Sequence, residues 1–364
     1  MHISELDTPA ILIDLDKMEH NLRSVADYAR EHHLRLRPHT KTHKIPALAR
    51  RQIELGAVGF TVAKVSEAEV MIEAAPEDLL VAYPVIGEQK LARLMSVAGK
   101  TRVTVALDSQ VSAEMLSKAA SHAGLTIHVL AEFDVGLGRV GVQPGHEIVE
   151  LARAIDALPA LRLGGVAFYP GHIKALDEEG FQALDRLSAT VEQVVEDFDH
   201  AGLCREIVSG GSTPTLFHSH RVKGMNEIRP GTYIFYDRNC VACGACQLEH
   251  CAASILVTVV STARQNGMMI DGGSKTFFSD RLVTGEDAYF GHLIEAPGAR
   301  FFRMNEEHGY VDLAAAARRF AIGDRVRVIP NHICVAMNLH EQVYGVRGEE
   351  VVETWRVAAR GKLQ

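Results

Sequence analysis

The segment Arg37-Pro38-His39-Thr40-Lys41-Thr42-His43-Lys44 contains the residues of this chain that are best suited to covalent chemistry. It ends a short β-type run, Leu34 to Arg37, and places a lysine among basic neighbours. Neighbouring cations and partial desolvation both favour the neutral amine, and only the neutral amine attacks a carbonyl. The segment therefore predicts that Lys41 condenses with an aldehyde. These residues alone leave an alternative open, a basic loop that binds an anion or is simply solvated.

Two turns rich in small residues could bind an anion. Ser209-Gly210-Gly211-Ser212-Thr213 follows a predicted strand, and Arg229-Pro230-Gly231-Thr232-Tyr233 forms a second turn of this kind. Glycines let backbone N–H groups approach an anion closely, and hydroxyl groups add further donors. In barrel enzymes the last two loops often bind phosphate. Together the two turns predict a phosphate site, although either one alone is an ordinary turn.

Three more side chains follow predicted strands, where barrel enzymes place their catalytic groups. Arg139 lies in Gly138-Arg139-Val140-Gly141, and Phe168-Tyr169-Pro170-Gly171-His172 supplies Tyr169 and His172. Taken singly, they are more simply explained as a surface arginine, a packing tyrosine and a hydrogen-bonded histidine.

The segment Pro330-Asn331-His332-Ile333-Cys334 contains a candidate pair of metal ligands. In an extended strand His332 and Cys334 would project to the same face, because strand side chains alternate. Imidazole and thiolate suit zinc, and two protein ligands leave positions for water or substrate. A buried cysteine beside an unrelated histidine is the simpler alternative. Glu306-Glu307-His308-Gly309 could support such a site or form an exposed turn.

Four of the six cysteines fall within one segment, at Cys240, Cys243, Cys246 and Cys251. Their spacing resembles the ligation of an iron–sulfur cluster. The last gap is one residue longer than in the bacterial ferredoxin pattern, and no proline follows Cys251. We therefore expect ordinary loop and core cysteines here.

The elements predicted to position these residues alternate between short β-type and longer helical runs. Such alternation indicates a parallel sheet. About nine strands with intervening helices fit an α/β fold, a (β/α)₈ TIM-like barrel with one extra strand. No GxGxxG follows an early strand, which disfavours a dinucleotide-binding sheet. The predicted strands are Ala10–Leu15, Leu34–Arg37, Val58–Ala63, Leu79–Tyr83, Arg102–Leu107, Thr126–Glu132, Leu163–Phe168, Ile207–Ser209 and Thr232–Phe235.

Beyond about Asp237 the pattern changes to short β-type runs separated by Gly, Asn and Pro. This change predicts two domains. The barrel would span residues 10–236, and a C-terminal β domain with the metal ligands would span residues 237–364 together with residues 1–9.

The composition, 47% hydrophobic and 23% charged over 364 residues, is that of an ordinary globular protein. No apolar run approaches the roughly 18 residues that span a bilayer, and the N-terminus lacks a signal-peptide charge pattern. A formal net charge of -8 argues against a nucleic-acid or anionic-membrane partner. We expect a cytoplasmic enzyme without a disulfide framework.

Taken jointly, these motifs resemble those of the D-threonine aldolase and D-serine dehydratase family, which has the fold type III architecture also seen in alanine racemase. The resemblance extends nearly from end to end. The matching motifs are Thr8-Pro9-Ala10, Arg37–Lys44, Gly138–Gly141, Tyr169–His172, Arg229–Tyr233, Asp271–Lys275, Glu306–Gly309 and Pro330–Cys334.

The resemblance implies a set of cofactor contacts. Lys41 would bind pyridoxal 5'-phosphate covalently, with Arg139 and Tyr169 against the cofactor ring. His332 and Cys334 would bind a divalent metal, zinc or manganese. The implied phosphate contacts are Gly210, Gly211, Ser212, Thr213, Gly231, Thr232 and Tyr233.

The implied activity is that of a lyase acting on small-molecule D-3-hydroxy-amino acids, in a homodimer. Our first expectation is retro-aldol cleavage of the D-threonine type, which yields glycine and an aldehyde. The alternative is a D-serine or D-3-hydroxyaspartate dehydratase, which yields a 2-oxo acid and ammonia. A non-catalytic pyridoxal-phosphate-binding protein would share the barrel and the lysine, but would lack a β domain with a metal pair.

One departure from the family pattern bears on this choice. Aldolases of the family carry a catalytic histidine three residues after the Gly-His pair, where this chain has Ala175. His172, Lys41 or the metal site would have to replace it. Ala175 and Cys334 both favour the dehydratase alternative.

Overall fold

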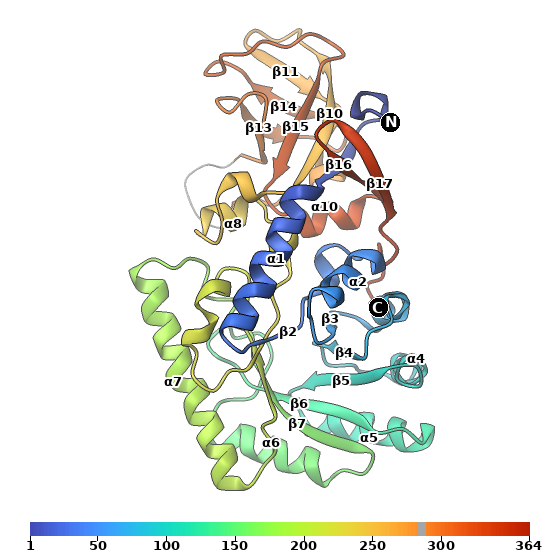
Figure 1. Ribbon diagram of the computed structural model, residues 1–364, viewed down its shortest axis with the longest axis vertical. Coiled ribbons are helices and arrows are strands. Elements are labelled where there is room, and N and C mark those ends of the chain that lie inside the picture. The colour runs from blue at the N-terminus through green and yellow to red at the C-terminus, as the bar shows by residue number, and fades with distance from the viewer. Residues whose placement is uncertain (283–288) are drawn as a thin grey trace. The chain divides into compact units, whose positions relative to one another are not determined.

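The computed structural model describes residues 1–282 and 289–364 (Figure 1). By its internal contacts the chain divides into two compact units. The barrel unit contains residues 24–41, 46–231 and 362–364, and the sheet unit contains residues 1–23, 42–45 and 232–361. The predicted boundary between residues 236 and 237 lies near the junction at Gly231 and Thr232, and stays a prediction. Over the described ranges, no helix is both long and apolar enough to cross a membrane.

The barrel unit is built on a parallel eight-stranded sheet. Its strands are β2 (Arg35–Leu36), β3 (Phe60–Val62), β4 (Asp78–Val81), β5 (Arg102–Leu107), β6 (Ile127–Glu132), β7 (Leu161–Ala167), β8 (Ile207–Gly210) and β9 (Glu227–Ile228). They follow the order β2-β9-β8-β7-β6-β5-β4-β3. A parallel bridge between His39 and Thr61 joins the two ends of this order, and the Thr61 amide donates to the Pro38 carbonyl at 2.8 Å. The sheet therefore closes, and the predicted barrel class is confirmed.

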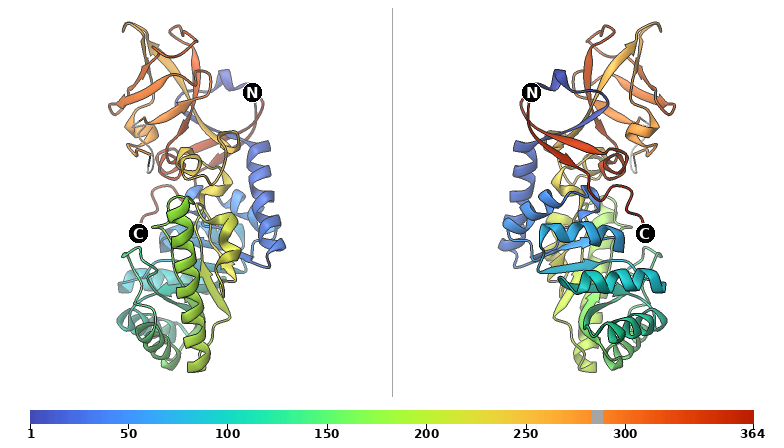
Figure 2. Two further views of the ribbon diagram at one scale, coloured as in Figure 1. Left: turned by 90° about the vertical axis from the view of Figure 1, so that its left-hand side faces the viewer. Right: turned by 90° about the vertical axis from the view of Figure 1, so that its right-hand side faces the viewer.

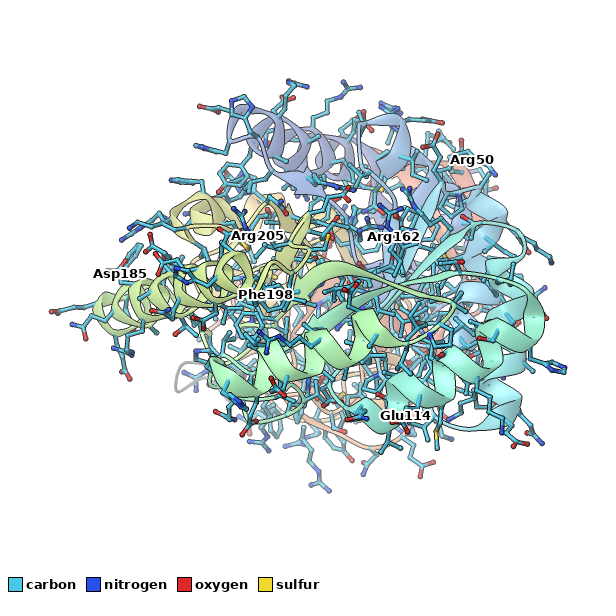
Figure 3. The ribbon with its side chains drawn as sticks, turned by 90° about the horizontal axis from the view of Figure 1, so that it is seen from below. Arg50, Glu114, Arg162, Asp185, Phe198 and Arg205 are labelled. Carbon is cyan, nitrogen blue, oxygen red and sulfur yellow. The ribbon has the colours of Figure 1, made fainter. Side chains whose placement is uncertain are left out.

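Helices connect most of these strands and lie outside them (Figure 2). They are α2 (Pro46–Glu54), α3 (Val65–Met71), α4 (Glu88–Ala98), α5 (Gln110–Ala123), α6 (His146–Ala157) and α7 (Glu178–Ala201), with α1 (Leu15–Glu31) before β2. In α7 the fully buried Phe198 points inward, while Asp185 points outward (Figure 3). Because the apolar residues of each helix lie on one face, the helix can cover the sheet with that face.

The sheet unit contains a mixed nine-stranded sheet. Its strands are β1 (Ala10–Asp14), β10 (Ala253–Ser261), β11 (Gly267–Ile270), β12 (Gly291–Leu293), β13 (Arg300–Met304), β14 (Gly309–Asp312), β15 (Arg325–Pro330), β16 (Gln342–Arg347) and β17 (Glu350–Arg356). The main path runs β13-β14-β11-β10-β1-β16-β17, and β15 pairs with β10 and β12. The short helices of this unit are α8 (Arg238–Ala242), α9 (Ser274–Phe277) and α10 (Ile333–Leu339).

Single 3₁₀ turns complete the chain. They are η1 (Ile3–Glu5), η2 (Thr40–Thr42), η3 (Ile72–Ala74), η4 (Leu216–Arg221), η5 (Thr232–Ile234) and η6 (Leu248–His250). The segment η4 stands between β8 and β9, where no α-helix is formed.

Two strands that we predicted for the barrel are wrong. The run at Ala10 forms β1, which pairs antiparallel with β10 and parallel with β16 in the other unit. An apolar run that is buried on both faces looks the same in either sheet. The run Thr232–Phe235 forms the turn η5, and the last barrel strand is the two-residue β9, which is too short to stand out by pattern.

The barrel interior encloses charged groups. Arg37 is 1% exposed and is the largest of the fully buried side chains. Its Nη1 donates to Asp78 Oδ1 at 2.9 Å, and its Nε lies 2.9 Å from Glu227 Oε2. Arg102 Nε binds the second Asp78 oxygen at 2.8 Å. Because these groups come from β4, β5, β9 and the residue after β2, the ion pairs tie distant parts of the barrel together.

Replacing Asp78 by Asn should lower the free energy of unfolding by about 3–5 kcal/mol, because Arg37 then stays buried with one charged partner missing. Urea unfolding of the full chain measures this loss. The control is Asp27→Asn, which breaks an ion pair with Arg30 in which both side chains are exposed. That change should cost less than about 1 kcal/mol. Equal losses in the two variants would contradict a structural role for the buried ion pair.

Candidate active site

The predicted cofactor-binding residues of the barrel follow its strands, so they share one edge. Parallel strands place all their carboxyl ends on the same side, where barrel enzymes have their active sites. Lys41 follows β2, Arg139 follows β6, and Tyr169 follows β7, while the two turns at Gly210 and Arg229 follow β8 and β9. The topology therefore brings these groups to the carboxyl edge of the barrel.

Lys41 lies in the middle of η2, immediately beyond this edge. The Thr40 hydroxyl donates to the Thr61 carbonyl at 3.1 Å, which attaches the turn to β3. The Lys41 side chain is exposed, so the partial desolvation that we expected for it is wrong. Its amine is therefore open to a reactant from solvent.

Lys44, the other lysine of this segment, is buried and already forms a hydrogen bond. Its side chain is buried, and its Nζ donates to Asn338 Oδ1 at 2.9 Å within the sheet unit. Of the two lysines, Lys41 is the one with an accessible amine.

The positive charges around Lys41 also act on the neighbouring side chain of His39. Its Nδ1 accepts the Lys41 backbone N–H at 3.4 Å. Burial lowers the pKa of His39 well below its ordinary value, and the positive charges of Lys41, Arg229 and Arg139 lower it further. A neutral imidazole among three cations indicates a local field suited to an anionic ligand.

Arg139 and Tyr169, predicted to lie against a cofactor ring, are neighbours. The Arg139 guanidinium carbon lies 4.8 Å from the centre of the Tyr169 ring, a cation–π arrangement. The Arg139 loop is fixed by Asp134, whose Oδ1 accepts the backbone N–H groups of Gly136, Leu137 and Gly138 at 3.0–3.2 Å. Asp134 thus anchors the loop that carries Arg139, while Tyr169 comes from the loop after β7.

His172 lies in the loop after β7, and its Nδ1 has no hydrogen-bond partner among the described residues. Burial lowers the pKa of this histidine, which favours the neutral ring. Gly136 lies beside the imidazole: a Cβ there would be 3.6 Å from the ring, an ordinary van der Waals contact. Ala175 has no titratable group, which leaves His172 as the imidazole of this loop.

The predicted phosphate turn after β8 requires glycine and has unused backbone N–H donors. A Cβ atom at Gly210 would lie 2.2 Å from the Phe168 ring, and Gly211 has a φ of +82°, so glycine is required at both positions. Within residues 1–282 and 289–364, the backbone N–H groups of Gly211, Ser212 and Thr213 donate to no protein acceptor. This arrangement of free amides fits an anion.

The second predicted phosphate turn is divided between the two units. Gly231 ends the main barrel segment, whereas Thr232 and Tyr233 begin η5 of the sheet unit. The Thr232 hydroxyl lies 3.6 Å from the Cys334 sulfur.

Two buried charged groups were missed as functional candidates. Arg229 lies inside the second turn motif, and its Nη2 donates to the Phe168 carbonyl at 2.8 Å. Glu132 ends β6, is 5% exposed, and has one carboxylate oxygen without a partner among the described residues. Burial raises the pKa of Glu132, and the positive charges of Arg229 and Arg139 oppose that rise. The sequence signal that could have identified both residues is a charged side chain at the end of a buried strand.

The candidate metal pair lies in the sheet unit, at the start of a helix. His332 is the N-cap of α10 and Cys334 is in its first turn, so the extended strand that we predicted here is wrong. The first turn of the helix nevertheless brings the imidazole and the thiol close enough to interact electrostatically. The Cys334 thiol also lies 3.2 Å from the Thr42 hydroxyl.

Asp237 orients the histidine of this pair. Its Oδ2 lies 3.0 Å from His332 Nδ1 and accepts the Ile333 backbone N–H at 3.1 Å. A carboxylate that holds one ring nitrogen leaves the other free to bind a metal, a common arrangement around protein-bound zinc. The residues present therefore fit a metal ion bound by two protein ligands.

The electrostatics of the pair favour its charged form. The Cys334 thiolate, with help from Asp237, raises the pKa of His332 to about 11. Burial acts to raise the pKa of Cys334, but the interactions with His332 and the Thr42 hydroxyl together lower it, and the net shift is downward. Thiolate is the form of cysteine that binds metals. No group of three or more ligating side chains occurs in the described chain, so water or substrate would complete the coordination of a metal here.

The remaining motifs have ordinary structural roles. Glu306 and Glu307 form ion pairs with Lys275 on the surface, the exposed-turn alternative. The Cys243 thiol donates to the Cys240 carbonyl at 3.2 Å, and burial raises the pKa of both thiols. Protonated, hydrogen-bonded thiols are what core cysteines are expected to be.

Comparison with known proteins agrees with this geometry. The alanine racemase N-terminal domain matches residues 13–239, and a domain described as "Putative serine dehydratase domain" matches residues 252–346. The D-threonine aldolase of Arthrobacter sp. is 32% identical over 99% of this chain and 94% of its own length. The D-threo-3-hydroxyaspartate dehydratase of Delftia sp. strain HT23 is 32% identical over 96% of this chain and 97% of its own.

Solved structures give the same result. The D-threonine aldolase of Filomicrobium marinum superposes with a TM-score of 0.92 and 32% identity, covering 99% of this chain and 98% of that one. A D-threo-3-hydroxyaspartate dehydratase has been solved as a histidine-to-alanine variant and as a cysteine-to-alanine variant, the latter in a metal-free form. The metal-free variant has a TM-score of 0.89 at 29% identity and covers 98% of both chains. This chain belongs to the D-threonine aldolase and D-serine dehydratase family of fold type III lyases, which share the alanine racemase-type barrel.

Proposed function

We propose that this protein is a pyridoxal 5'-phosphate- and divalent-metal-dependent lyase that cleaves D-3-hydroxy-amino acids of the D-threonine type to glycine and an aldehyde. The single observation that carries the proposal is the accessible amine of Lys41 on the same barrel edge as a turn with unused backbone donors. A cofactor with both an aldehyde and a phosphate needs that combination.

The barrel residues fit pyridoxal phosphate. Lys41 would hold the aldehyde carbon, and the amides of Gly211, Ser212 and Thr213 would hold the phosphate. Arg139 and Tyr169 offer a flat, positively charged surface for the ring. When bound, the cofactor supplies an electron sink for charge that develops at the substrate Cα.

Proton transfer would fall to the residues of the same edge. His172 has a neutral imidazole whose Nδ1 is unpaired, so it can accept a proton there. Lys41 would provide a second basic nitrogen. These two groups are our candidates for the work of the histidine that Ala175 replaces.

The metal would bind to His332 and Cys334 of the sheet unit, and zinc or manganese is proposed. Such an ion polarises an oxygen ligand as a Lewis acid. The pre-formed contact of Asp237 with His332 supports the assignment. A D-threo-3-hydroxyaspartate dehydratase of similar fold has been solved as a cysteine-to-alanine variant in a metal-free form.

Elimination to a 2-oxo acid and ammonia is the second candidate function. Ala175 and Cys334 favour it, and a dehydratase is among the relatives of similar identity. We also propose a cytoplasmic homodimer, which size-exclusion chromatography with light scattering would test.

Lys41→Ala should abolish the covalent adduct with pyridoxal phosphate, because no other described amine of this segment is accessible. Borohydride reduction followed by peptide mapping locates the adduct in the wild-type chain. Lys44→Ala is the matched control and should retain the adduct at position 41. An adduct at Lys44 would reassign the lysine.

Incubation with D-threonine separates the two outcomes. Glycine and acetaldehyde in equal amounts are expected from the proposed cleavage. Formation of 2-oxobutanoate and ammonia would replace it by elimination. L-Threonine serves as the control and should remain unchanged.

Asp237→Asn should weaken zinc binding about 10- to 100-fold, because the ligating imidazole loses its charged acceptor. Competition with a chromophoric chelator measures the affinity without any turnover assay. Asp177→Asn is a suitable control, since Asp177 caps α7 through the Gly180 N–H at 2.9 Å. Zinc affinity that is unchanged in Asp237→Asn would remove this aspartate from the site.

A further inference from the structure

A continuous row of hydrogen bonds runs through the barrel interior towards its carboxyl edge. Ser209 of β8 and Glu227 of β9 are paired in register and fully buried. The Ser209 hydroxyl donates to Glu227 Oε1 at 2.7 Å, and Arg229 Nη1 donates to the same hydroxyl at 2.5 Å. Beyond this row, Arg37 Nε forms an ion pair with Glu227 Oε2, and Arg35 Nε lies 3.7 Å from the same oxygen.

The direction of these hydrogen bonds is forced by their chemistry. A guanidinium group has donors and no acceptor, so the Ser209 oxygen must accept from Arg229. A serine hydroxyl has one proton, which is then committed to Glu227. The Ser209 hydroxyl therefore has one orientation. It links Glu227 to Arg229 through two hydrogen bonds, so the carboxylate stabilises the guanidinium without touching it.

The same hydroxyl sets the position of Arg229. Its guanidinium is held at two points, Ser209 Oγ and the Phe168 carbonyl, both near the ends of barrel strands. If the hydroxyl were missing, two opposite and incompletely paired charges would face each other in the interior. Arg229 would then gain by closing directly on Glu227, away from the barrel edge.

We propose that Ser209 is a positioning residue, a spacer that keeps Arg229 one hydroxyl group away from Glu227 and so holds its guanidinium at the cofactor edge. The proposal deepens the proposed function and rests on it for the role of that edge. Arg229 acts on this edge already, since its charge lowers the pKa of His39, the neighbour of Lys41.

The direct test is a crystal structure of the cofactor-free Ser209→Ala chain. We expect Arg229 to leave the Phe168 carbonyl and to contact Glu227. If Arg229 instead stays in place, with or without a water molecule at the position of the lost hydroxyl, the spacer role is wrong. This arm needs no cofactor, so it stands even if the proposed function fails.

The second test is pyridoxal phosphate affinity, measured by fluorescence titration of the cofactor-free protein. Ser209→Ala should weaken binding at least about tenfold, the effect of losing one hydrogen bond to a charged group. It should also shift the absorbance maximum of the bound cofactor. Ser209→Thr, which keeps the hydroxyl, should restore both properties.

Ser117→Ala is the matched control. Ser117 is buried in α5 of the same unit, and its hydroxyl donates to the Pro159 carbonyl at 2.6 Å. It should lower thermal stability as Ser209→Ala does, with affinity and absorbance unchanged. An equal loss of affinity in Ser117→Ala or in Ser209→Thr would reduce the Ser209 effect to packing and overturn the proposal. A wild-type chain that binds no pyridoxal phosphate would refute the proposed function, and the crystal structure alone would then judge the spacer.

Discussion

The structure of the barrel depends on a carboxylate shared by two buried arginines. Glu227 contacts Arg37 directly and reaches Arg229 through the Ser209 hydroxyl. Buried charges are tolerated only when they are paired, so the strands that supply these groups must hold a fixed register. Burial lowers the pKa of Arg229, and the nearby carboxylates of Glu132 and Glu227 counteract that decrease. The edge that bears the lysine and the glycine turn is built on this register.

The sequence predicted the features that follow from a local residue pattern. It missed the residues whose role depends on their neighbours in three dimensions. Short apolar runs between helices identified most barrel strands, and the lysine segment and both glycine turns were found by residue type. β1 was assigned to the barrel because nothing in an apolar run says which sheet will bury it. Arg229 and Glu132 went unnoticed because a charge in a strand becomes informative only when its neighbours are known.

The strand that we predicted for His332 and Cys334 is wrong, and their role as metal ligands stays a prediction. Alternation along a strand would bring His332 and Cys334 to one face, and the first turn of α10 brings them together as well. Two backbone geometries give the same contact at this spacing, so the motif alone does not distinguish them. The choice between aldol cleavage and elimination has a similar origin, since the proposed lysine, cofactor and metal would serve both. The residues that bear on the choice are Ala175, in a loop with one imidazole, and Cys334.

Asp237 serves two helices at once. One of its oxygens accepts the Cys240 N–H at the start of α8, and the other accepts the Ile333 N–H at the start of α10. The protein thus has a reason to keep this carboxylate that is independent of any metal. A descendant that abandoned metal chemistry would still carry the aspartate for the sake of its fold. Its occurrence in a relative is therefore poor evidence of metal dependence, and the histidine and cysteine are the residues to inspect.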